Sequence, residues 1–323
     1  MAVTRILLVD NGSLQPAATL QLRLLSKEVG RLLDQVVYPV SVLHSHKIDP
    51  ALLDGQPAVI FEQAVRQAKA DGISELIVLP LFIGPSLAIT EYLPKVFAEA
   101  NAVKMKLSIR EPLFGPELIS MLIDNLKSAG WSKGSGTVYL CDHGSPIREV
   151  TRCRDFFALS LRNQLGLNED ELIACSMERR DGPEYDFNKP LLEDALQQAK
   201  GTAVVLMLFL LPGRHAGSDG DVATIAKEHA PDGLRWKLSP LLGTHPALPA
   251  LLSRRHLHSP NFKTTKIAAI TALLATGLLP VLGSIPAPKD QGTGASLMIW
   301  LGAFAVIFTV LFLFLRAKAW MKS

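Results

Sequence analysis

The first 258 residues of the chain contain an internal repeat, and this repeat constrains the fold more than any other feature. The stretch Ile6-Leu-Leu-Val-Asp-Asn-Gly-Ser13 resembles Val138-Tyr-Leu-Cys-Asp-His-Gly-Ser145, an apolar run that leads into a polar turn. A second apolar run, residues 76–83, is matched by residues 203–210, and a proline follows each run. Self-similarity of this kind indicates a duplicated structural unit.

Two further pairs of segments support the duplication. The helical pattern of residues 57–69 is matched by residues 190–200, and residues 111–115 read like residues 239–243. Continuous apolar runs that alternate with amphipathic helices are typical of a parallel sheet covered on both faces. We therefore predict an α/β fold with two tandem three-layer αβα domains and parallel sheets, one over residues 1–130 and the other over residues 131–258.

The last part of the chain, residues 259–323, has a different character. Residues 267–285 and 295–315 carry no charge, and each stretch is long enough as a helix to cross a hydrocarbon core. We predict a two-helix membrane hairpin that acts as an anchor, because neither stretch has an ionisable residue at mid-depth. Two alternatives stay open, a pair of buried core helices and a re-entrant first helix softened by Gly277 and Pro280.

Basic residues flank this hairpin on the same side. They precede the first stretch and follow the second, at Arg254, Arg255, Lys263, Lys266, Arg316, Lys318 and Lys322. The positive-inside rule then places both ends of the hairpin in the cytoplasm. We expect a membrane-anchored protein whose two α/β domains lie on the cytoplasmic side.

Composition excludes several classes of protein. The net charge of +3 is small and dispersed, and no basic face with interleaved aromatic residues appears, so we expect no nucleic-acid partner. The three cysteines, Cys141, Cys153 and Cys175, never occur as Cys-x-x-Cys. This pattern argues against a disulfide framework or an iron–sulfur cluster and fits a reducing compartment. We also expect no signal peptide, because the chain begins with a short apolar strand.

Three residues of the second half stand at the ends of predicted strands. His143 follows residues 138–142, Glu178 follows residues 172–177, and His215 follows residues 203–211 after a short turn. Ligands of parallel sheets bind beyond the carboxyl ends of the strands, so we expect these side chains to meet in one cleft.

Two imidazoles and a carboxylate suit a divalent metal such as cobalt, iron or nickel. A neutral imidazole also accepts a proton near neutral pH. The alternative is that each histidine is a structural residue at the end of its strand.

The duplicate provides an internal control for this hypothesis. At the corresponding positions the first half has Asn11, Leu43 and Ala88. The shared framework therefore does not require the three polar side chains, and we predict that the first half is catalytically silent.

Positive charge also distinguishes the second half. Arg179, Arg180 and Arg214 flank the three candidate residues, and arginine suits bidentate recognition of carboxylates. We assign these arginines and Ser145 to substrate binding, with solvated loop charges as the alternative for the arginines. A hydrolase with Ser145 as nucleophile is a further alternative, disfavoured because the chain has no Gly-x-Ser-x-Gly motif.

Three motifs together carry a family resemblance that covers roughly residues 1–250. They are Cys141-Asp-His-Gly-Ser-Pro146, Ser176-Met-Glu-Arg-Arg-Asp-Gly-Pro183 and Leu210-Leu-Pro-Gly-Arg-His-Ala-Gly217. With this spacing they resemble the sirohydrochlorin chelatases of the class II tetrapyrrole chelatases. The first half departs from the pattern, because Asn11 stands where a family histidine is expected, and the membrane hairpin is not part of the usual soluble form.

The resemblance implies insertion of Co²⁺ or Fe²⁺, and in some members Ni²⁺, into sirohydrochlorin, in cobalamin or siroheme biosynthesis. The metal would be a substrate, and no tightly bound cofactor is implied. By the same resemblance His143 and His215 would bind the metal and accept pyrrole protons, and Glu178 would assist. The alternative from another class is a non-catalytic, membrane-docked metal or tetrapyrrole binding protein. The sequence leaves the oligomeric state and the choice of metal open.

Overall fold

Two four-stranded parallel sheets form the framework of the computed structural model, which describes residues 3–100, 102 and 104–258. Their strand orders, β2-β1-β3-β4 and β6-β5-β7-β8, are the same in the two halves. The strands are β1 Thr4–Asp10, β2 Val37–Ser41, β3 Glu75–Pro80, β4 Lys106–Ile109, β5 Thr137–Asp142, β6 Leu172–Ser176, β7 Thr202–Met207 and β8 Arg235–Leu238. The predicted duplication and the parallel sheets are confirmed.

Each sheet is the middle of three layers. Along β1, Ile6 and Leu8 pack into one hydrophobic cluster, whereas Leu7 and Val9 pack into another on the opposite face. The central strand β5 alternates in the same way. Because both faces of these strands are buried, helices have to cover both, as the continuous apolar runs predict.

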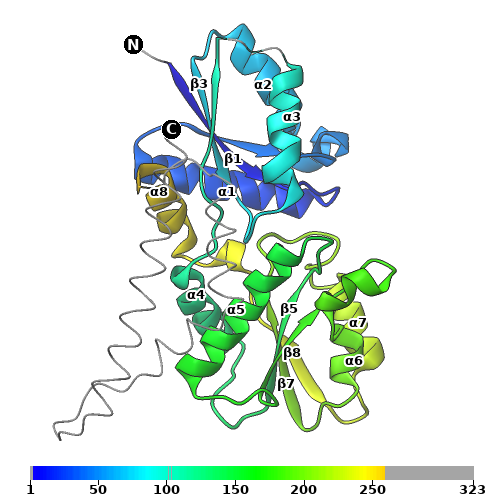
Figure 1. Cartoon of the computed structure of the whole chain (residues 1–323). Helices are drawn as coiled ribbons and strands as arrows, with labels where there is room; N and C mark the ends of the chain where they lie inside the picture. Colours follow the sequence, from blue (N-terminus) through cyan, green and yellow to red (C-terminus); the bar gives the residue numbers. More distant parts are fainter. Residues whose placement is uncertain (1–2, 101, 103, 259–323) are drawn as a thin grey trace, which may run out of the picture. The chain divides into compact units, whose positions relative to one another are not determined.

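The outer layers are paired helices. α2 (Phe61–Ala70) and α3 (Leu93–Glu99) lie together on one face of the first sheet, and α6 (Leu192–Leu196) and α7 (Asp221–His229) do so on the second (Figure 1). Short helical turns connect the elements: η1 Ser45–Lys47, η2 Pro50–Leu53, the π-helical η3 Ala88–Tyr92, η4 Pro183–Asn188 and η5 Leu242–Thr244.

The inner helices interlock the two halves. α1 (Pro16–Leu33) packs against α8 (Leu248–His258), the last described helix of the chain. α4 (Pro116–Ser128) packs against α5 (Arg148–Leu165) and β7. One hydrophobic cluster therefore runs through both halves, and all described residues belong to one compact unit, residues 1–274.

Three sequence expectations need correction. The predicted strand 203–211 ends at Met207, because its neighbour β5 ends at Asp142. Leu208 still donates to the Cys141 carbonyl, but the next two carbonyls, of Phe209 and Leu210, accept from Leu242 and Gly243 instead of continuing the sheet with β5. The predicted helix 190–200 is shortened to α6, ahead of the turn at Gly201. The match of residues 111–115 to 239–243 is shifted by one position, since Arg110 and Ser239 make the equivalent backbone bonds to Val78 and Val205.

Among the described residues, none of the helices combines the length and apolar character needed to cross a membrane. Both predicted spans, 267–285 and 295–315, lie outside the described residues. The membrane hairpin therefore stays a prediction.

Candidate active site

The turn after β5 places His143 at the edge of the sheet. Gly144 has a φ of +88°, and a Cβ at this position would collide with the carbonyl of Glu178, so only glycine fits. The first half repeats this packing with Gly12 against the carbonyl of Leu43. The structure thus confirms that Leu43 occupies the position of Glu178, and it shows that the turn itself brings residues 143 and 178 together.

His143 is half exposed and faces Glu178. Its Nδ1 lies 2.9 Å from the carbonyl oxygen of Gly144, and its Nε2 lies 3.5 Å from Oε1 of Glu178. A carbonyl oxygen only accepts hydrogen bonds, so Nδ1 carries the hydrogen and a neutral ring has its lone pair on Nε2. A lone pair and a carboxylate oxygen then face each other, an arrangement that a proton or a cation between them stabilises.

His215 is oriented by a carboxylate that the sequence analysis missed. Its Nδ1 lies 2.6 Å from Oδ2 of Asp221, the first residue of α7. The same oxygen lies 3.4 Å from Nε of Arg214. Since the carboxylate accepts the Nδ1 hydrogen, Nε2 of His215 is also the nitrogen with the free lone pair. The sequence signal for this residue is an aspartate that follows a glycine-rich loop, at the position where α7 begins in the structure.

The two imidazoles lie next to each other. Their ring centroids are 4.6 Å apart with an interplanar angle of 79°. The structure therefore unites His143, His215 and Glu178, which are separated by up to 72 residues in the sequence. Within the described part of the chain, no group of three or more His, Cys, Asp or Glu side chains is preformed to hold a metal ion.

A cleft of about 710 Å³ surrounds the histidine pair, within the range of pockets that hold organic ligands. Residues of both halves line it. The polar and charged lining residues are Asp10, Asn11, Ser13, Gln15, His44, Ser86, Asp142, His143, Arg214 and His215. Both halves therefore contribute to the walls of the cleft, although the histidine pair comes from the second half alone.

The predicted substrate-binding residues, all of which the structure describes, lie in different surroundings. Arg214 lines the cleft and is exposed. Arg179 donates to the carbonyl oxygens of Arg180 and Gly182, which stabilises its own loop, and Arg180 is exposed. The Ser145 hydroxyl accepts the Ile147 N–H at the start of α5. The geometry brings only Arg214 into the lining of the cleft.

A buried network of hydrogen bonds and an ion pair stabilises the turn that carries His143. Asp142 accepts hydrogen bonds from the Ser176 hydroxyl at 2.6 Å and from the Gly144 N–H at 3.1 Å. The guanidinium of Arg154 donates to Ser176 at 2.6 Å and to the Asn188 carbonyl at 2.9 Å, and lies 3.9 Å from Asp142. Burial raises the pKa of Asp142, and the Arg154 charge opposes this shift. The network joins the ends of β5 and β6, from which His143 and Glu178 project.

Comparison with known proteins gives a family match for the second half. Residues 137–259 match the CbiX family model, and this match contains His143, Glu178 and His215. The comparison with curated proteins gave no match.

Solved chelatases share the fold. SirB from Bacillus subtilis with Fe³⁺ has a TM-score of 0.56 at 18% identity, over 79% of this chain and 94% of that chain. CbiX, described as the terminal enzyme of siroheme biosynthesis in denitrifying bacteria, has a TM-score of 0.54 at 18% identity, over 78% and 98%. The sirohydrochlorin chelatase SirB from Bacillus subtilis subspecies spizizenii in complex with cobalt has a TM-score of 0.53 at 18% identity, over 78% and 93%. At this identity the likeness establishes the shared fold.

Proposed function

We propose that the protein is a metal chelatase of the CbiX type that inserts Co²⁺ or Fe²⁺, or Ni²⁺, into sirohydrochlorin, and the match of residues 137–259 to the CbiX family model supports this. The observation that carries the proposal is the adjacent pair of imidazoles, each with Nδ1 engaged and Nε2 free, inside a cleft that both halves line. Relatives with this fold are described with iron and with cobalt.

The reaction exchanges two pyrrole protons for one divalent ion. As each N–H bond breaks, its electron pair stays on nitrogen and binds the metal, and the proton needs an acceptor. Nε2 of His143 and Nε2 of His215 are suitable acceptors because both carry lone pairs. Asp221 stabilises the imidazolium that forms at His215, and Glu178 does so at His143.

The same atoms suit the incoming metal. Two ligand atoms about 2.1 Å from one ion at a tetrahedral angle lie about 3.4 Å apart. Nε2 of His143 and Oε1 of Glu178 are separated by 3.5 Å. Arg214, exposed at the cleft, is placed to meet the carboxylates of the macrocycle.

The test is a multiple-turnover insertion assay with purified full-length protein, sirohydrochlorin and each metal in turn, followed by the change in absorption spectrum. We expect many products per protein, and we expect His143→Ala and His215→Ala each to lower kcat by about a hundredfold or more. His46→Ala is a matched control, since His46 is exposed in the first half. Product that stops at one equivalent per protein would instead establish the alternative, a metal or tetrapyrrole carrier.

We further propose that residues 259–323 anchor the protein in a membrane, with the α/β halves on the cytoplasmic side. The support is the pair of uncharged stretches and their basic flanks in the sequence. Expression of the full chain and of residues 1–258, followed by membrane fractionation, tests this. The full chain should sediment with membranes and the shorter chain should not, and equal distribution would contradict the anchor.

A further inference from the structure

Asp10 is a buried carboxylate on the first-half wall of the cleft. Its residue is 7% exposed, and its Oδ1 is buried without a hydrogen-bond partner among the described residues. Leaving a buried charged oxygen without a partner is costly, and such groups cluster at functional sites. The proposed function assigns no role to it.

The duplicate shows what Asp10 lacks. In each half the last aspartate of the central strand lies beside a serine of the neighbouring strand, Asp142 beside Ser176 and Asp10 beside Ser41. A glycine with positive φ follows each aspartate in the turn, Gly144 in one half and Gly12 in the other. The two helices that follow are both 18 residues long, and their seventh residues are Arg154 in α5 and Leu22 in α1. The first half therefore keeps the buried carboxylate without its cation. Burial raises the pKa of Asp10 to about 6, opposed by the hydrogen bonds from Ser41 and Gly12.

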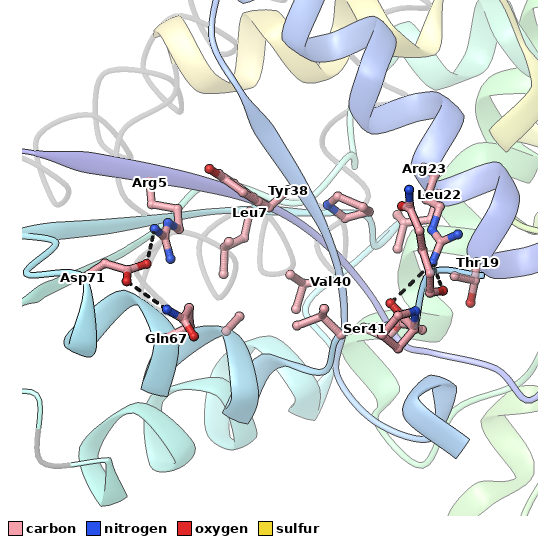
Figure 2. A pocket seen from close by; sticks show the side chains of 16 residues that line it. Arg5, Leu7, Thr19, Leu22, Arg23, Tyr38, Val40, Ser41, Gln67 and Asp71 are labelled. Atoms are coloured by element: carbon pink, nitrogen blue, oxygen red, sulfur yellow. Dashed lines mark hydrogen bonds and ion pairs between the residues drawn. The ribbon is translucent and has the colours of Figure 1, made fainter. Parts of the chain in front are cut away.

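Because Leu22 stands where the second half has Arg154, space remains beside Ser41. A cavity of about 450 Å³ lies beside β2, and Leu22 and Ser41 are among the residues that line it (Figure 2). In the second half, the Arg154 guanidinium occupies the corresponding side of Ser176. Asp10 lines the cleft, Ser41 lines this second cavity, and the two residues are register neighbours on β1 and β2, so they lie between the two spaces.

Building on the proposed function, we propose that Asp10 and Ser41 form a proton outlet, through which a proton released in the cleft leaves into the cavity beside β2. The first half then takes part in the reaction, because it provides a path for the proton at the position that Arg154 fills in the second half.

The transfer balances in two steps. A pyrrole proton that an imidazole of the cleft has accepted passes first to the Asp10 carboxylate and neutralises it, which restores the lone pair of the imidazole. The protonated Asp10 then donates to the lone pair of the Ser41 oxygen, while the Ser41 hydroxyl proton passes to solvent in the second cavity. Asp10 returns to the ionised state and the hydroxyl is restored, so each cycle moves one proton.

Other charged groups face the same two spaces. In the cleft they are His44, Asp142, His143, Arg214 and His215, and in the cavity they are Arg5, Arg23 and Asp71. Arg5 and Asp71 form an ion pair at 2.6 Å, and Arg23 donates to the carbonyls of Leu53 and Gln56. Imidazoles in general also titrate near neutral pH, so a pH profile alone does not identify Asp10, and variants are needed.

The test compares Asp10→Asn and Ser41→Ala with two matched controls in the full chain. Asp54→Asn removes an exposed aspartate of the same half, and Ser45→Ala removes a buried hydroxyl that has no hydrogen-bond partner among the described residues. In the multiple-turnover assay from pH 5.5 to 8.5, we expect both outlet variants to lower kcat by about tenfold with little change in KM. The pH profile of kcat should lose the contribution of Asp10 near pH 6 in Asp10→Asn and keep that of the imidazoles, and the controls should match the wild type.

A second measurement separates this inference from the proposed function. Infrared difference spectra of the full chain with bound sirohydrochlorin, recorded before and after one equivalent of Co²⁺ is added, should show a carboxylic-acid band that is absent in Asp10→Asn. If the wild type stops at one equivalent of product but this band responds to the metal, the chelatase proposal fails and the role of Asp10 in proton uptake stands. If kcat and its pH dependence are unchanged in both outlet variants, or the band does not respond to the metal, the outlet is refuted.

Discussion

Because Asp10 is buried without a neighbouring cation, we predict that the stability of the protein depends on pH, and this prediction does not depend on catalysis. In the folded chain the pKa of Asp10 is about 6, compared with an ordinary value of 3.8. This difference corresponds to about 3 kcal/mol, from about 1.4 kcal/mol per unit. Because the folded-state pKa is raised, ionisation of Asp10 opposes folding, so its contribution is favourable at low pH and is lost as pH rises through about 6.

Replacing Asp10 by asparagine removes this pH dependence. Relative to the wild type, Asp10→Asn should gain about 2.4 kcal/mol in free energy of unfolding between pH 4 and pH 8, because an unfolded aspartate is already partly ionised at pH 4. The compared quantity is the difference in unfolding free energy between variant and wild type at the two pH values. A cost of burying the amide that does not depend on pH cancels in this comparison. The assay is urea unfolding of the full chain, followed by tryptophan fluorescence, with Asp54→Asn as control. Unfolding midpoints of variant and wild type that stay parallel across the pH range would refute the reasoning.

Two further predictions concern the second half. Arg154→Leu leaves Asp142 buried without its cation, so we expect a loss of about 3–5 kcal/mol in free energy of unfolding near neutral pH, measured by urea denaturation; a loss below about 1 kcal/mol would contradict the proposed support of the turn. Asp221→Asn removes the charge that stabilises protonated His215, so we expect kcat to fall by about 10- to 100-fold in the insertion assay. Asp219→Asn, an exposed neighbour, is the control, and equal rates for the two variants would argue against the role of Asp221.

Much of the fold followed from local patterns in the sequence. Continuous apolar runs indicated strands buried on both faces, and the repeated turn indicated a duplication, because both signals depend on neighbouring residues. Local patterns could not predict that α4 packs against the second half or that α8 packs against the first half. An amphipathic helix shows that it has a buried face, but its pattern does not say which sheet it covers. The end of β7 was missed for a related reason, since it depends on where the neighbouring strand stops.

The candidate site was predictable where chain topology alone brings residues together. His143, Glu178 and His215 follow parallel strands that end at one edge, and the structure places them in contact. Asp221 was missed because its contact with His215 depends on how an irregular loop returns. Arg154 reads in the sequence as an ordinary charged residue of a surface helix, and only packing shows that it is buried. The difference between Asp142, which has this cation nearby, and Asp10, which has none at the equivalent position, therefore could not be predicted either.

The most direct test of the central claim is the ligand sphere of Co²⁺ added to the full chain with sirohydrochlorin present, measured by X-ray absorption before insertion is complete. We expect scattering from two imidazoles in the wild type, and from one in either His143→Ala or His215→Ala. An unchanged spectrum in the double variant would show that the metal binds elsewhere and would contradict the assignment of the site.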